Sequence, residues 1–97
     1  MKSVFIAFDQ AHEHRILDIL DRLSLRGFTR WAQVSGRGSE RGEPHYGSHA
    51  WPSLASAIIT FAPDESVGPL LERLHALDEE RPRLGLRAFV WNVEKTV

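Results

Sequence analysis

Two histidines, His45 and His49, are four positions apart in a stretch that reads SGRGSERGEPHYGSHAWP from Ser35 to Pro52. A loop that folds back on itself can bring both imidazoles to one ion, and imidazoles without a thiolate suit zinc, nickel or copper(II). The sequence therefore predicts a candidate site for a divalent transition metal at His45 and His49. The alternative is that His45 packs with Trp51 at the base of the loop while His49 is solvated.

The first half of the same stretch combines glycines with arginines in the order GRGSERG. Glycines let successive backbone amides converge on an anion, and arginine guanidinium groups hold oxyanions through paired hydrogen bonds. No Lys-Ser/Thr pair follows, so the pattern is not that of a Walker loop. The candidate residues for an effector or anion site are Gly36, Arg37, Gly38 and Arg41. The alternative is that these glycines serve as a hinge.

Tyr46 and Trp51 are the candidates in this stretch for contact with a partner protein. A connection of this length is uncommon in a compact domain, and is usually functional or disordered when it occurs. Because its glycines and polar side chains offer little apolar surface, we expect the segment to be flexible without a ligand.

The composition indicates one small domain that spans residues 1–97 and has no catalytic role. Twelve Lys and Arg residues against thirteen Asp and Glu give a net charge of −1, which argues against a dedicated nucleic-acid-binding protein. The run VFIAF is too short for a signal peptide or a membrane span. The absence of cysteine fits a cytoplasmic protein and removes the thiol nucleophile. Ser48 beside His49 lacks a third group to orient the histidine, so no enzymatic activity is predicted.

The spacing of apolar residues predicts four strands and two helices. Short runs of β-branched and aromatic residues predict strands at 3–8, 28–35, 54–61 and 86–93. The first helix is expected from about residue 11 to residue 26, with Asp9 as its cap and Gly27 as its terminating glycine. The second helix begins at Pro63 and Asp64 and ends at Arg81, because a residue before proline leaves helical geometry.

This order of elements predicts an α+β fold, a ferredoxin-like βαββαβ sandwich. Two helices cover one face of a four-stranded antiparallel sheet, and the long loop joins the second and third strands. A half-solvated strand alternates apolar and polar residues, yet the runs 4–8 and 88–91 are apolar at every position. We therefore expect the uncovered face to pack against copies of the chain. The alternative is a monomer with a helix or tail lying over that face.

Three further histidines are predicted to lie at the surface. His12 and His14 are two residues apart in the first turn of the predicted helix and so point to different sides. His75 flanks the apolar stripe of the second helix and is expected to be exposed.

Together these features resemble the nitrogen-regulatory PII superfamily of small trimeric signalling proteins, and in particular its PII-like homologues. The resemblance covers essentially the whole chain and is carried by the element order, the run GRGSERGEPHYGSHAWP and the final LGLRAFVWNVE. It implies a homotrimer whose sheets surround a central axis, with effector clefts between subunits that commonly bind adenine nucleotides. It also implies that residues 35–53 form a T-loop that contacts a partner, such as a membrane transporter or an enzyme. The alternative function is a metal-binding or metal-sensing module that uses His45 and His49, for example in cation efflux.

The turn before the last strand departs from the PII pattern. In PII proteins this turn reads GDGKIFV, and the corresponding residues 84–90 here read LGLRAFV. Arg87 replaces the basic residue, whereas Leu84 and Leu86 replace two glycines that would let the backbone approach a phosphate. The sequence therefore favours a transition metal over an adenine nucleotide as the effector. The alternative role for Arg87 is an ion pair with Glu94 or with a neighbouring subunit.

Overall fold

Four strands and two α-helices follow one another in the predicted βαββαβ order. The computed structural model describes residues 1–34 and 55–97. The elements in chain order are β1 (Lys2–Asp9), the 3-10 helix η1 (Gln10–His12), α1 (Glu13–Arg22), β2 (Phe28–Val34), β3 (Ala55–Ala62), α2 (Asp64–Glu80), the 3-10 helix η2 (Pro82–Leu84) and β4 (Arg87–Asn92). The ferredoxin-like fold class is thereby confirmed.

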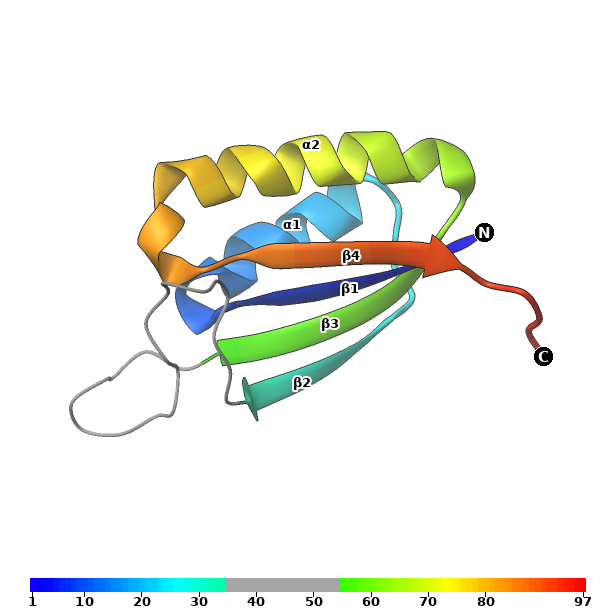
Figure 1. Cartoon of the computed structure of the whole chain (residues 1–97), viewed down its shortest axis with the longest axis horizontal. Helices are drawn as coiled ribbons and strands as arrows, with labels where there is room; N and C mark the ends of the chain where they lie inside the picture. The colour runs from blue at the N-terminus through cyan, green and yellow to red at the C-terminus, as the bar shows by residue number, and fades with distance from the viewer. Residues whose placement is uncertain (35–54) are drawn as a thin grey trace.

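The four strands form one antiparallel sheet in the order β2-β3-β1-β4, and both α-helices lie on the same side of it (Figure 1). In the centre of the sheet Phe5 of β1 lies opposite Ile59 of β3 and Phe89 of β4. Because paired residues of an antiparallel sheet share a face, these three side chains project from the side opposite the helices.

The core lies between the sheet and the helices. Alternate residues of β1 face the helices, since Val4, Ile6 and Phe8 are all buried. They pack with residues that recur every three or four positions along α1 and α2, among them Ile16, Leu20, Leu70, Leu74 and Leu77. None of the helices in the described ranges is long and apolar enough to span a membrane.

The first helix ends four residues earlier than predicted. Ser24 takes a left-handed conformation (φ 59°), and the N–H of Leu25 donates to the carbonyl of Leu20 at 2.8 Å. This geometry closes a helix in the way a terminal glycine usually does. It returns Leu25 to the core, where it is buried. The prediction that Gly27 terminates the helix is therefore wrong; its carbonyl instead accepts a hydrogen bond from the Thr60 hydroxyl at 2.8 Å.

The face of the sheet opposite α1 and α2 carries large aromatic side chains. Phe61, Phe89 and Trp91 are 51%, 58% and 48% exposed. Phe61 and Trp91 flank Ser3 from the two neighbouring strands, and Phe89 is in the adjacent row opposite Phe5. Within the described residues, the prediction that the strands are apolar on both sides is thus confirmed for β1 and β4, and Phe61 extends the aromatic surface onto β3.

Candidate functional site

Most of the predicted site residues lie outside the described residues, in the range 35–54. They are Gly36, Arg37, Gly38, Arg41, His45, Tyr46, His49 and Trp51. Their assignment to metal, anion or partner binding stays a prediction. Arg87, the remaining candidate, can be placed in the structure.

Arg87 opens β4 and is held by two neighbours. Its Nη1 donates to the carbonyl of Leu86 at 2.7 Å and lies 3.7 Å from Oδ2 of Asp78, near the end of α2. The proposed pairing with Glu94 is wrong, because Glu94 follows the opposite end of β4, about 20 Å away along an extended strand. Arg87 is 43% exposed, so its guanidinium group remains accessible to an anion.

His12 is buried, contrary to the prediction that it is a surface residue. It is 4% exposed, and its Nε2 atom has no hydrogen-bond partner among the described residues. The sequence does contain the signal: His12 precedes the buried Ile16 by four positions and so shares the inward face of the helix. His14 and His75 are exposed, as predicted.

Burial dominates the electrostatics of His12. Loss of solvation lowers its pKa below the ordinary histidine value, while the carboxylates of Asp9 and Asp78 oppose this effect. The guanidinium groups of Arg15 and Arg81 lower the pKa further. The imidazole is therefore neutral at neutral pH in the folded protein.

The neutral His12 is expected to make stability depend on pH. In the unfolded chain the imidazole gains a proton near pH 6.5, whereas in the folded chain it does so at lower pH. Between these values the unfolded state binds more protons, so stability falls as the pH decreases from about 6.5. The free energy of unfolding should be measured with denaturant at pH 5.5 and 7.5, at one chain concentration. Its decrease from pH 7.5 to pH 5.5 should be smaller for His12→Gln than for the wild type. Equal losses in the two proteins would contradict this origin.

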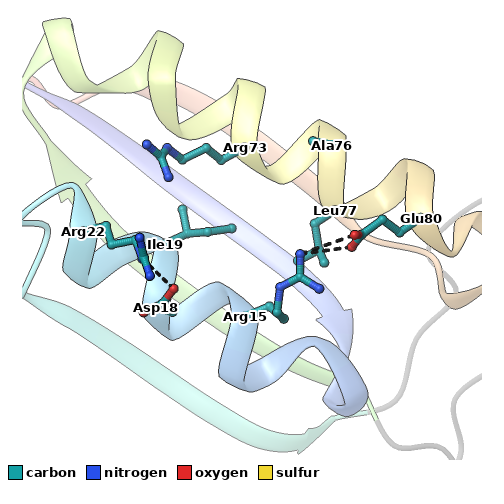
Figure 2. A pocket seen from close by; sticks show the side chains of 8 residues that line it. All are labelled: Arg15, Asp18, Ile19, Arg22, Arg73, Ala76, Leu77 and Glu80. Carbon is teal, nitrogen blue, oxygen red and sulfur yellow. Dashed lines mark hydrogen bonds and ion pairs between the residues drawn. The ribbon is translucent and has the colours of Figure 1, made fainter.

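Cavities lined by described residues lie beside His12, between the helices and on the aromatic face. One of about 320 Å³ borders His12 and is lined by Ala11, Arg15, Leu77, Glu80, Arg81 and Leu84. A second of about 280 Å³ lies between α1 and α2, where Arg15 and Glu80 form an ion pair at 3.1 Å across the groove (Figure 2). A third of about 660 Å³ lies on the aromatic face beside Ser3, Phe61 and Trp91.

The groove between the helices carries arginines from both sides. Arg22 is paired with Asp18 at 2.8 Å within α1, whereas Arg73 of α2 lines the groove without an ion pair to any described residue (Figure 2). These side chains are solvated, so their pairs contribute little to stability. In residues 1–34 and 55–97, no group of three or more His, Asp or Glu side chains is arranged to hold a metal ion.

The turn before β4 accommodates both of its leucines. Gly85 has a left-handed conformation (φ 77°, ψ 55°), which glycine adopts without strain. Leu86 is 4% exposed and belongs to the core cluster, while Leu84 borders the cavity beside His12. The Leu86 side chain is therefore occupied in the core and does not cover the solvent side of the turn.

Comparison with known proteins identifies the family. No protein-family model matches the chain, and no curated protein matches it either. Among solved structures, CPII from Thiomonas intermedia K12, a nitrogen regulatory PII-like protein bound to ADP, AMP and bicarbonate, is 30% identical. The match covers 95% of this chain and 84% of CPII, with a TM-score of 0.78. The chain belongs to the PII-like proteins.

Two further structures agree with this assignment. A candidate PII-like signalling protein from Thermus thermophilus is 26% identical, with 95% of this chain and 85% of that one covered and a TM-score of 0.67. A DUF3240 family protein from Shewanella baltica is 16% identical. The match covers 99% of this chain and 93% of the Shewanella chain, with a TM-score of 0.68. At that identity the last likeness concerns the fold alone. The resemblance drawn from the sequence is thereby confirmed.

Proposed function

We propose that this PII-like protein is a homotrimeric, non-enzymatic regulator that binds an adenine nucleotide and signals its binding to a partner protein. The observation that carries the proposal is the likeness to CPII, a regulatory protein whose structure contains ADP, AMP and bicarbonate. The chain matches CPII over nearly its whole length at 30% identity.

The nucleotide takes precedence over the metal as the proposed effector, which reverses the preference drawn from the sequence. That preference rested on the two leucines of the turn before β4. Leu86 is directed into the core, and Gly85 supplies a left-handed turn beside Arg87. Together with the loop residues Gly36, Arg37, Gly38 and Arg41, Arg87 would hold the phosphate groups. Guanidinium groups and glycine amides are suited to that chemistry.

The aromatic face of the sheet supports the trimer. Phe61, Phe89 and Trp91 are each about half exposed, and they come from the two strands that flank β1. An exposed apolar surface of this kind usually marks a contact with another protein. In the proposed assembly three such faces meet around the central axis, which leaves the helices outside and the effector clefts between subunits.

The partner contact is assigned to the loop at 35–53, with Tyr46 and Trp51 as its aromatic anchors. The partner would be a transporter or an enzyme in the cytoplasm. Aromatic side chains combine a large apolar surface with few rotatable bonds, which suits them to binding sites that form only when a ligand orders the loop.

Calorimetric titration with ADP tests this function. The wild-type protein is expected to bind ADP with about one site per chain, and AMP and bicarbonate should be titrated alongside because CPII was solved with all three. Inorganic sulfate serves as a control for simple anion binding. If no heat of binding or structural change is detected with any of the three ligands, the proposed effector is wrong.

The spacing of His45 and His49 favours a transition metal as the second candidate effector. Metal ligation requires neutral imidazole, so zinc affinity is expected to fall as the pH decreases through about 6.5. His45→Ala or His49→Ala should remove most of the zinc binding, whereas His75→Ala, on an exposed face of α2, should not. Zinc binding that survives the double replacement of His45 and His49 would refute this site.

A further inference from the structure

Four chain segments meet at one end of the molecule. The end of β1, the start of α1, the end of α2 and the start of β4 all lie there (Figure 1). They carry Asp9, His12, Asp78 and Arg87, of which Asp9 and His12 are buried. Leu77, Glu80 and Arg81, which surround Asp78 in the sequence, line one cavity with His12. Arg87, which is proposed to bind the effector, therefore shares this end of the molecule with His12, a buried side chain whose charge can change.

Asp78 is the charged group that links the two basic side chains. Its Oδ2 lies 3.7 Å from Arg87 Nη1, and its charge acts on His12. Its other oxygen, Oδ1, is buried and has no hydrogen-bond partner among the described residues; the same is true of His12 Nε2. Buried polar atoms are seldom left unpaired, so a pair of such atoms in one cluster calls for an explanation. A neutral imidazole has one N–H, whereas a protonated one donates from both nitrogens.

We propose that His12 is a proton-dependent switch that controls Arg87 through Asp78. While His12 is neutral, the Asp78 carboxylate pairs with Arg87 and offsets its charge. When His12 gains a proton, the carboxylate turns to the imidazolium and releases Arg87 to bind an anionic group of the effector. Binding of the effector by the released Arg87 rests on the proposed function, whereas the exchange of partners at Asp78 does not.

The other charged groups around His12 leave Asp78 as the carboxylate that can respond. Asp9, at the end of β1, accepts a hydrogen bond from the N–H of Ala11 at 2.8 Å and so caps the following turn. Arg15 of α1 is paired with Glu80 at 3.1 Å, and Arg81 follows α2. Burial and then both guanidinium groups lower the pKa of His12, so the switch operates below neutral pH. The cavity of about 320 Å³ beside His12 gives solvent protons a route to the ring.

The coupling must be reciprocal. If protonation of His12 strengthens effector binding at Arg87, then effector binding must also favour protonation of His12 and raise its pKa. The coupling free energy is the same in both directions. Binding of ADP near pH 6 is therefore expected to be accompanied by proton uptake at His12.

NMR titration between pH 5 and 8 tests the switch without any ligand. The His12 ring signals and the Arg87 Nε–H signal are expected to shift with the same midpoint in the wild type. Asp78→Asn should lower that midpoint for His12 and remove the response of Arg87, and His12→Gln should also remove it. Glu13→Gln is the matched control, because it breaks the exposed ion pair with Arg30 and leaves this cluster untouched. An Arg87 signal that ignores the titration of His12 would overturn the proposal.

ADP affinity provides the second readout. Asp78→Asn should bind ADP about threefold to tenfold more tightly than the wild type at pH 7.5, because Arg87 no longer has a competing carboxylate. The ratio of wild-type to His12→Gln affinity should rise as the pH falls from 7.5 to 5.5, and a constant ratio would refute the switch. If ADP binds to none of these proteins, the proposed effector fails, and the NMR titration alone decides on the switch.

Discussion

Phe89→Glu is expected to convert the protein from a particle of about three chain masses into a monomer. Phe89 is 58% exposed and lies in the middle of β4, where it pairs with Phe5 of the central strand β1. Full burial of a phenylalanine side chain contributes about 1.5–3 kcal/mol, and the exposed part of Phe89 supplies a share of this in each of the three subunits. A glutamate brought next to its two symmetry copies adds repulsion and the cost of burying charge. Light scattering coupled to size-exclusion chromatography measures the mass directly.

Ala76→Glu is the control for this change. Ala76 is exposed on α2, on the opposite side of the sheet, so the same charge there should leave the mass at three chains. The circular dichroism spectrum of both variants should match that of the wild type, because neither side chain belongs to the core. A wild-type protein that is already a monomer at micromolar concentration would contradict the assembly.

Arg87→Gln is expected to weaken ADP binding by roughly 10- to 100-fold. A hydrogen bond that involves a charged group contributes about 1.5–3 kcal/mol, and each 1.4 kcal/mol is a factor of ten in affinity. Glutamine keeps a polar side chain of similar reach but loses the charge and the forked donors of the guanidinium group. Calorimetry at constant salt concentration measures the change, because the binding of a charged ligand depends on screening.

Arg83→Gln gives the matched comparison for this second change. Arg83 is an exposed arginine in η2, four residues before Arg87, and forms no ion pair to a described residue. Its replacement should alter ADP affinity by less than threefold or so, the size expected of general electrostatic attraction. Equal losses in the two variants would show that ADP senses only the net charge of this surface.

The element order and the apolar pattern were sufficient to predict the fold. The apolar run of β1 and the apolar residues of α1 and α2 supply the observed core. The end of α1 was missed because a serine, Ser24, takes the left-handed conformation that usually marks glycine. The left-handed conformation of Ser24 allows Leu25 to reach the core. That tertiary contact cannot be read from the local sequence.

The candidate site was predictable only in part. Arg87 was singled out from its place in the turn before the last strand, but its partner was not. Asp78 was not singled out, because its contact with Arg87 depends on how the end of α2 packs beside the start of β4. His12 was placed at the surface because its spacing was compared with that of His14; comparison with Ile16, four positions on, gives the buried face that the structure shows.

A crystal structure of the protein with ADP tests the central claim most directly. The account predicts three chains around one axis, with Phe61, Phe89 and Trp91 buried between the sheets. It also predicts one nucleotide in each cleft between subunits, with its phosphates on Arg87. Nucleotide bound elsewhere, or an aromatic face that remains in contact with solvent, would contradict it.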